Sequence, residues 1–167
     1  LTGGGARAAY QVGFLRHLVS RHPELAPGII TGVSAGGIIA TWLAVREGSF
    51  GDAIDRLTHV WRDLRTEHVF RVDPGDLTSR VTRWGLRLVS GGAPGTPRAR
   101  SLLDTAPLRE LLFEKLNPDE AGRFPAIARN LEAGKLRAVA LTASSYTTGS
   151  SVTWVQDTDG CWVLTSD

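Results

Sequence analysis

The sequence predicts an α/β fold, and three observations lead to this class. Residues 28–31 form a short apolar, β-branched run that is typical of a buried strand. The stretch that follows, residues 37–45, is apolar on nearly every side, as in a buried helix. A second continuous apolar run, within residues 136–143, predicts another buried strand much later in the chain. Strands and helices that alternate in this way indicate a sheet with helices packed against it.

The other elements follow from apolar spacing and from the positions of glycine and proline. Helices are predicted at residues 6–22, 37–47, 52–64, 107–116 and 124–132. Strands are predicted at residues 152–155 and 161–164, on either side of a turn that contains Asp159 and Gly160. We find no internal repeat and no second domain boundary, so we expect one domain over residues 1–167.

The chain is organised around the sequence Gly32-Val33-Ser34-Ala35-Gly36, which reads G-x-S-x-G. It lies between the first predicted strand and the helix after it, as in a nucleophile elbow. Such a turn places the serine in a strained backbone conformation, with its hydroxyl clear of the sheet. A Cβ at Gly32 or Gly36 would crowd the turn. The sequence therefore predicts Ser34 as a nucleophile.

A second glycine motif opens the chain. Gly3, Gly4 and Gly5 directly precede the first predicted helix, and consecutive backbone N–H groups at a helix N-terminus are suited to binding an anion. If this loop lies beside Ser34, its N–H groups form an oxyanion hole. Arg7 lies in the first helical turn, where a cation opposes the helix dipole, so we expect it to have an anionic or carbonyl partner.

The G-G-G-x-R motif at residues 3–7 and G-V-S-A-G-G at residues 32–37 together resemble the patatin-like phospholipase family. Residues 101–112 and the region of residues 141–153 resemble further segments of its bacterial members. The resemblance implies a three-layer α/β/α sheet with flanking helices, here incomplete at both ends. It also implies hydrolysis of lipid acyl esters by a Ser–Asp dyad without histidine, with Gly4 and Gly5 in the oxyanion loop. Ala8 stands where the family motif usually has glycine.

The sequence does not contain a clear match to the aspartate of the Ser–Asp dyad. The family places it in D-G-[AG], and the one Asp-Gly pair here, Asp159-Gly160, is followed by Cys161 and reads first as a hairpin turn. We expect the catalytic aspartate beyond Asp167, with Asp159 as the candidate inside the chain. His59 and His68 follow the serine too closely for the usual Ser–acid–His order, so we expect packing or surface roles for them.

Composition sets further bounds. With 42% hydrophobic and 22% charged residues, the chain can form a core and is not a disordered segment. The single cysteine, Cys161, excludes an internal disulfide and a cysteine-based metal site. No metal or organic cofactor is implied. No apolar run reaches the roughly 20 residues of a membrane span. The chain contains no methionine, and only Leu1 and Thr2 represent the strand expected before Gly3, so we expect both ends to be cut.

Residues 77–88 have an amphipathic pattern in which Arg80, Arg83 and Arg87 share one face and Trp84 lies on the apolar one. One interpretation is a helix packed on the domain. The other is an interfacial helix, with Trp84 at a lipid boundary and the arginines on headgroups. We expect a cytoplasmic or peripheral membrane protein. Nucleic acid binding is not indicated, because no aromatic residues interleave with a basic surface.

The resulting hypothesis is a lipid ester hydrolase, of the phospholipase A or lysophospholipase kind. Three alternatives stay open. The first is a nucleotide-binding module, because Gly3-x-Gly5-x-x-Ala8 matches G-x-G-x-x-[GA]. That reading needs an acid about twenty residues later, after a strand, and Glu24 is near but misplaced. The others are a Ser–His–Asp esterase or acyltransferase and a non-catalytic lipid-binding or interaction protein.

Overall fold

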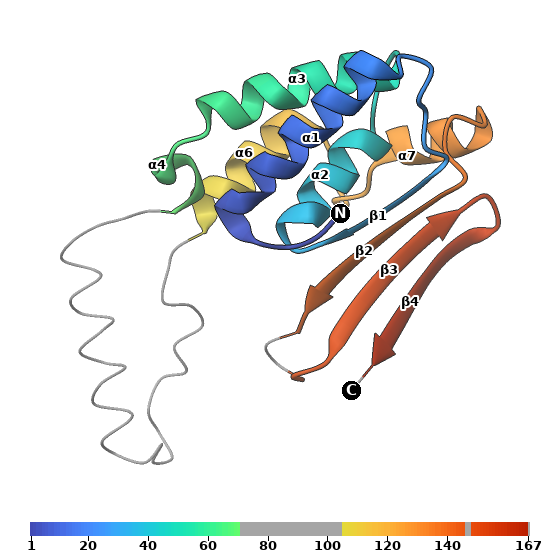
Figure 1. Cartoon of the computed structure of the whole chain (residues 1–167). Helices are drawn as coiled ribbons and strands as arrows, with labels where there is room; N and C mark the ends of the chain where they lie inside the picture. The colour runs from blue at the N-terminus through green and yellow to red at the C-terminus, as the bar shows by residue number, and fades with distance from the viewer. Residues whose placement is uncertain (71–104, 146–147, 167) are drawn as a thin grey trace. The chain divides into compact units, whose positions relative to one another are not determined.

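The computed structural model describes residues 1–70, 105–145 and 148–166 (Figure 1). It divides the chain into two compact units, the first formed by Leu1–Asp63 with Leu116–Asp167 and the second by Leu64–Lys115. The expected amphipathic segment with Arg80, Arg83, Trp84 and Arg87 lies outside the described residues. A single domain over residues 1–167 therefore stays a prediction.

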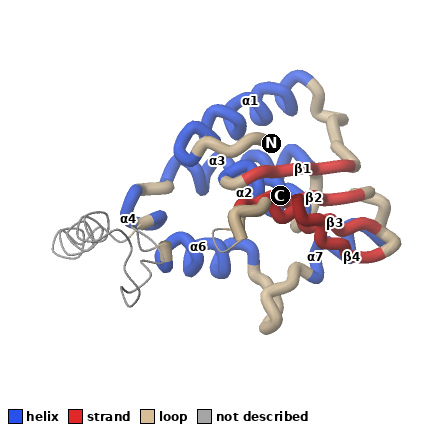
Figure 2. The backbone as a smooth tube through the Cα atoms, turned by 90° about the horizontal axis from the view of Figure 1, so that it is seen from below, coloured by secondary structure: helices blue, strands red, loops and turns tan. Residues whose placement is uncertain are grey.

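The first unit contains a mixed four-stranded sheet in the order β1-β2-β3-β4 (Figure 2). Its strands are β1 (Ile29–Val33), β2 (Ala138–Ser144), β3 (Ser151–Asp157) and β4 (Gly160–Ser166). Strands β1 and β2 are parallel, whereas β2–β3 and β3–β4 are antiparallel. Helices together with this sheet confirm the predicted α/β class.

Four helices of the first unit gather on one face of the sheet (Figure 1). They are α1 (Ala8–Arg21), α2 (Ala35–Ala44), α3 (Phe50–Asp63) and α7 (Pro125–Glu132), and the 3-10 turn η1 (Gly5–Arg7) leads into α1. Helix α3 begins earlier than the sequence pattern predicted, because Ser49 caps it. The Ser49 hydroxyl accepts the Asp52 N–H at 3.1 Å, and the Asp52 carboxylate accepts the Ser49 N–H at 3.1 Å, which forms a capping box. The Ser49 hydroxyl also donates to this carboxylate at 2.7 Å, and this bond, followed by the one from the Ser49 N–H, lowers the pKa of Asp52.

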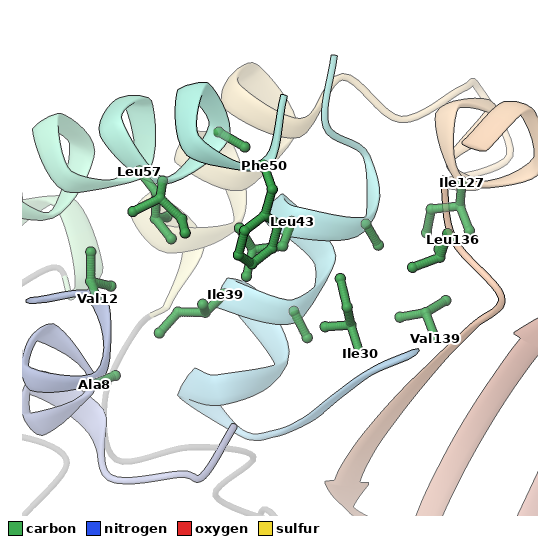
Figure 3. Packing of buried hydrophobic residues seen from close by; sticks show 14 of the residues in the cluster. Ala8, Val12, Ile30, Ile39, Leu43, Phe50, Leu57, Ile127, Leu136 and Val139 are labelled. Atoms are coloured by element: carbon green, nitrogen blue, oxygen red, sulfur yellow. The ribbon is translucent and has the colours of Figure 1, made fainter. Parts of the chain in front are cut away.

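The core lies between these helices and the sheet (Figure 3). Its largest fully buried side chains are Ile39, Leu43, Ile54, Leu57 and Leu136. On β1 burial alternates, so that Ile30 and Gly32 are buried whereas Ile29 and Val33 are 56% and 45% exposed. Within the described residues of this unit, helices thus cover one face of the sheet, and the second helical layer of a three-layer arrangement is not among them.

The C-terminal end of α2 is closed by two buried polar side chains. The Arg46 guanidinium donates hydrogen bonds to the carbonyl oxygens of Leu43, at 3.0 Å, and Lys135. The Asn130 amide donates to the carbonyls of Ala44 and Arg46 at 2.8 and 3.0 Å. These bonds satisfy carbonyls that a helix end leaves unpaired, and α2 accordingly ends before the predicted residue 47. Burial lowers the pKa of Arg46.

In the second unit the structure describes α4 (Thr66–Val69) and α6 (Ala106–Leu116), whose last residue belongs to the first unit. The guanidinium of Arg109 lies 5.1 Å from the centre of the Phe113 ring, one turn further along α6. Helix α6 confirms the helix predicted at residues 107–116 within one residue. Across the described ranges, no helix is both long and apolar enough to cross a membrane.

Candidate active site

The turn between β1 and α2 consists of one residue. Strand β1 ends at Val33 and α2 begins at Ala35, so Ser34 alone reverses the chain, with φ 52° and ψ −123°. Side chains rarely adopt this conformation, which costs on the order of 1–3 kcal/mol. Among the described residues one other non-glycine has positive φ, Asn117 at 47°, and asparagine tolerates that region well. Ser34 is the described residue whose strain calls for a functional explanation.

Gly32 and Gly36 permit this turn through close backbone approach. A Cβ on Gly32 would lie 2.3 Å from the Gly36 carbonyl oxygen and 2.7 Å from the Cβ of Ala40. A Cβ on Gly36 would lie 2.5 Å from the carbonyl oxygen of Thr2 and 2.6 Å from that of Leu1. Any side chain at either position would therefore overlap backbone atoms that cannot easily move.

The N-terminal segment runs beside β1. The backbone nitrogen of Leu1 donates to the Thr31 carbonyl at 2.8 Å, and the Val33 N–H donates to the Leu1 carbonyl at 3.1 Å. This pattern is that of a parallel ladder. The segment thus brings Gly3 against Ser34, since a Cβ on Gly3 would lie 3.2 Å from Ser34 Cβ and 3.8 Å from Ser34 Oγ. The two glycine motifs, far apart in the chain, are adjacent in space.

The glycine loop turns sharply after Gly3. Gly4 has φ 141° and Gly5 has φ 54°, conformations that favour glycine. The Arg7 N–H donates to the Gly4 carbonyl at 3.1 Å, which starts η1. Within the described part of the chain, the N–H groups of Gly4 and Gly5 have no acceptor. They are donors without a protein partner, in a loop whose first residue, Gly3, lies against Ser34 at the N-terminus of α2 with its partial positive charge.

Arg7 lies over this loop, with its Nε 3.7 Å from where a Cβ of Gly4 would be. Arg7 is exposed and lies at the start of α1. No carboxylate partner for Arg7 occurs among the residues that the structure describes. The guanidinium is accordingly available to an anionic ligand next to the glycine loop.

Asp159 lies at the other end of the sheet from Ser34. With Thr158 it forms the two-residue turn between β3 and β4, where the Asp159 N–H donates to the Asp157 carboxylate at 2.6 Å. The strand register aligns Asp157 with Ala138 and Ala138 with Ile29, the first residue of β1. Ser34 follows the last residue of β1, about 16 Å further along the strand at 3.3 Å per residue. The structure therefore does not bring Asp159 and Ser34 together.

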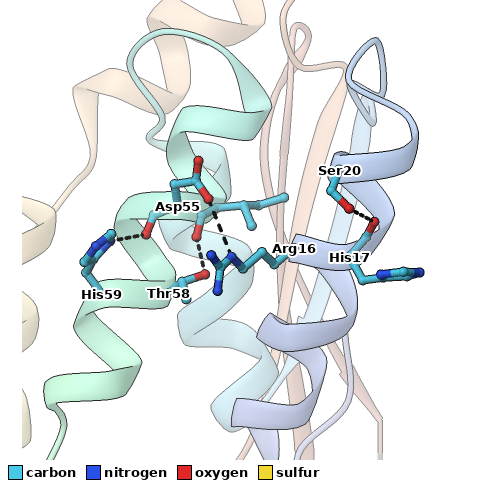
Figure 4. A network of polar contacts seen from close by, with 7 residues as sticks. Arg16, His17, Ser20, Asp55, Thr58 and His59 are labelled. Atoms are coloured by element: carbon cyan, nitrogen blue, oxygen red, sulfur yellow. Dashed lines mark hydrogen bonds and ion pairs between the residues drawn. The ribbon is translucent and has the colours of Figure 1, made fainter.

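The four histidines are all described, and none has an interaction with Ser34. His59 lies on α3, where its Nδ1 is 2.8 Å from the carbonyl oxygen of Asp55, near the Arg16–Asp55 ion pair (Figure 4). The Nδ1 of His68 accepts the Arg65 N–H at 3.2 Å within the second unit. The Ser34 hydroxyl itself has no hydrogen-bond partner among the described residues.

The nucleotide-binding alternative and a metal site both depend on where acidic and other polar side chains lie. Glu24 lies in the loop between α1 and β1, 3.4 Å from the His22 ring, and not at the end of a strand as a nucleotide-binding acid would be. In the described ranges there is no cluster of three or more His, Cys, Asp or Glu side chains that could hold a metal ion.

One interaction at the site was not predicted from the sequence. The Thr2 N–H donates to Gln11 Oε1 at 2.9 Å, and Gln11 Nε2 donates back to the Thr2 carbonyl at 2.8 Å. Gln11 is a polar residue beside the apolar face of α1, close to the buried Ala8 and Val12. That position is the signal in the sequence, because a polar side chain at the margin of a core needs partners.

An exposed, strained serine between a strand and a helix, beside a glycine loop with unpaired N–H groups, places the chain in the class of α/β proteins with a hydrolase-like site. The family model described as patatin-like phospholipase matches residues 1–160, so the chain belongs to that family. The suspected resemblance is confirmed. Family membership indicates lipid acyl hydrolase activity and a lipid substrate in general. No curated protein and no solved structure matches the chain significantly.

Proposed function

We propose that the protein hydrolyses carboxylic esters of lipids, as a phospholipase A or lysophospholipase, with Ser34 as the nucleophile. The observation that carries the proposal is the strained backbone of Ser34, φ 52°, with Gly3 packed against its side chain. A strained conformation persists where the surrounding structure enforces it, which is common at reactive sites. It is the arrangement of a nucleophile elbow, exposing the hydroxyl between the sheet and the helix.

The glycine loop supplies the oxyanion hole in this proposal. The Gly4 and Gly5 N–H groups, without an acceptor among the described residues, are suited to bind the oxygen that becomes negative when Ser34 adds to a carbonyl. Gly3 keeps the space beside Ser34 Oγ open for the reacting carbonyl. Removal of one such donor costs roughly 3–4 kcal/mol of transition-state stabilisation in comparable enzymes.

Ser34 needs a base, and we propose an aspartate, as in the Ser–Asp dyad of the family. The base takes the Ser34 proton as Oγ attacks the ester carbonyl carbon. The tetrahedral intermediate collapses, the C–O bond to the alcohol breaks, and the alcohol leaves with that proton. Water then attacks the acyl-serine, gives its proton to the same carboxylate, and releases the fatty acid with Ser34 reprotonated. The aspartate is not Asp159, which lies at the far end of the sheet.

The test compares three variants of the full-length protein. Ser34→Ala removes the nucleophile with little change in volume, and Ser34→Gly removes it while relieving the strain at φ 52°. Ser20→Ala, at an exposed serine of α1, is the matched control. Labelling by a fluorophosphonate probe, hydrolysis of a nitrophenyl ester and thermal unfolding are measured for each.

We expect both Ser34 variants to lose labelling and at least about 1,000-fold in kcat, since residual catalysis comes from the oxyanion hole alone. Ser34→Gly should also unfold at higher temperature than Ser34→Ala, because glycine adopts positive φ without strain. Ser20→Ala should behave as the unaltered protein. Turnover that persists in Ser34→Ala would overturn the assignment of the nucleophile. Absence of labelling in the unaltered protein would favour a non-catalytic lipid-binding role.

The alternative Ser–His–Asp mechanism is tested separately. Replacing His59 or His68 by Asn should leave kcat unchanged, because the two rings interact with backbone groups four and three residues earlier in the chain and not with Ser34. A loss in either variant as large as that of Ser34→Ala would replace the dyad by a histidine base.

A further inference from the structure

We infer that Gln11 is a positioning residue, which fixes the glycine loop beside Ser34 by clamping the backbone of Thr2. The inference rests on the proposed function, in which this loop is the oxyanion hole. Gln11 does not belong to either glycine motif. In the described structure its side chain forms hydrogen bonds with Thr2 and none with Ser34 or with the N–H groups of Gly4 and Gly5.

The clamp uses both halves of the side-chain amide. Gln11 Oε1 accepts the Thr2 N–H at 2.9 Å, while Nε2 donates to the Thr2 carbonyl at 2.8 Å. A primary amide can copy a peptide group, so Gln11 pairs with Thr2 as a neighbouring strand would. The two bonds join residues nine positions apart and close the chain around the glycine loop.

The loop needs such a constraint because glycine has the largest conformational freedom of any residue. Residues 3–5 are three consecutive glycines, and in the described structure the N–H groups of Gly4 and Gly5 make no bond that would hold them. Their positions therefore depend on the two ends of the loop. One end is η1, and the other is Thr2, which Gln11 holds.

Thr2 also lies against α2. The Thr2 carbonyl oxygen would be 2.5 Å from a Cβ on Gly36, so this peptide is packed against the first turn of the helix that follows Ser34. A rotation of the Thr2 peptide would turn its carbonyl relative to that helix and move Gly3, which contacts Ser34. Gln11 opposes this rotation because it binds the Thr2 N–H and the Thr2 carbonyl, which belong to the two successive peptide groups on either side of the Thr2 Cα. Donors fixed before reaction are the basis of oxyanion stabilisation.

The test uses the full-length protein with Gln11→Leu, which removes both bonds, and Gln156→Leu on β3 as the matched control. Five quantities are measured: kcat and KM for a nitrophenyl ester, Ki for a trifluoromethyl ketone, hydrogen exchange of the peptide covering residues 1–9, and thermal unfolding. The ketone forms a tetrahedral adduct with serine and so reports on the oxyanion hole.

We expect Gln11→Leu to lower kcat about 10- to 100-fold, as for a displacement of donors by up to 1 Å, with little change in KM. Ki for the ketone should rise in parallel, exchange in residues 1–9 should accelerate, and the melting temperature should fall by only a few degrees. Gln156→Leu should change none of these. A merely structural role would lower the melting temperature without a parallel change of kcat and Ki.

A second variant, Gln11→Glu, tests the clamp even if Gln11→Leu folds poorly. A neutral carboxyl can accept the Thr2 N–H and donate its O–H to the Thr2 carbonyl, whereas a carboxylate lacks the donor. The bond to the neutral form raises the pKa of the introduced carboxyl above its usual value of about 4.3. The ratio of variant to unaltered kcat should therefore rise as the pH falls through about 6 to 4, whereas the ratio for Gln11→Leu should stay flat.

Two results would overturn the inference. One is Ser34-dependent turnover that Gln11→Leu leaves unchanged, which would remove the role of Gln11 and keep the proposed function. The other is an unaltered protein without Ser34-dependent turnover, in which case the proposed function fails and the positioning role falls with it.

Discussion

The two glycine motifs of the site use the same residue for different physical reasons. Gly32 and Gly36 are glycines because there is no space, since a Cβ on either would lie within 2.6 Å of a backbone oxygen. Gly4 and Gly5 have space, with no heavy atom within 3.4 Å of an added Cβ, but have φ of 141° and 54°. The first motif is limited by packing and the second by backbone conformation.

The difference assigns the two motifs different tasks. A turn held by close packing is rigid by itself, and it keeps Ser34 in a conformation that serine does not prefer. A loop that glycine makes possible only through its dihedral angles has no packing to hold it, so its order must come from its ends. Substitutions at the two motifs should therefore differ in kind as well as in size.

The largest effect is expected for Gly32→Ala. Its Cβ would lie 2.3 Å from the Gly36 carbonyl oxygen, so β1 and α2 would have to separate. We expect a loss of about 3–5 kcal/mol in the free energy of unfolding, measured by urea denaturation, and low soluble yield. A loss below that of Gly4→Ala would show that this turn is not limited by packing.

Gly4→Ala should cost less, about 1–3 kcal/mol, because the new side chain is strained at φ 141° but clashes with nothing. The loop should relax to relieve this strain, and esterase activity should fall more than the stability change explains. Parallel urea titrations and kinetics at a temperature where both proteins are folded separate the two effects. A destabilisation equal to that of Gly32→Ala would contradict the comparison.

Gly3→Ala should affect stability less, although Gly3 is the residue of the glycine loop that lies against Ser34. Its Cβ would be 3.2 Å from Ser34 Cβ, a tight contact that moves the serine by a few tenths of an ångström. We expect kcat/KM to fall about 10-fold, while the free energy of unfolding changes by less than about 1 kcal/mol. Steady-state kinetics together with denaturation check this. A variant as active as the unaltered protein would show that the reacting acyl group does not bind next to Gly3.

The smallest effect is expected for Gly13→Ala, the control for all three. Gly13 lies in the middle of α1, where an added Cβ meets no atom within 4 Å. Alanine should stabilise the helix by about 0.5–1 kcal/mol and leave activity unchanged. A destabilised Gly13→Ala would mean that α1 has a contact on this side.

Much of the fold and of the site could be predicted from the sequence, because local patterns determine it. The strained turn at Ser34 follows from G-x-S-x-G between an apolar strand and an apolar helix, and the Asp159 hairpin follows from Asp-Gly between two β-branched runs. The strand predicted at residues 28–31 ends two residues before β1 does, since Gly32 weakens the strand pattern. Pairing of Gly32 with Leu141 on β2, a distant residue, extends it.

What could not be predicted depends on contacts between distant residues. The end of α2 is set by Asn130, which binds the Ala44 carbonyl across 86 residues of chain. The clamp of Gln11 on Thr2 depends on the position of Leu1 beside β1, which no local pattern contains. The roles of Ser34 and of the loop at residues 3–5 stay predictions, as does the position of the catalytic aspartate.

The parallel pairing of β1 and β2 has a consequence for synthesis of the protein. Ile29 pairs with Ala138, so the ribosome must add on the order of a hundred residues after β1 before its partner exists. At about 5–20 residues per second, β1 waits roughly 5–20 seconds with that edge unpaired. During this time Leu1 can pair with the other edge and α2 can cover one face. The segment before the glycine loop can therefore pair early, whereas the Ser34 N–H gains its acceptor, the Thr142 carbonyl at 3.2 Å, only once β2 has been made.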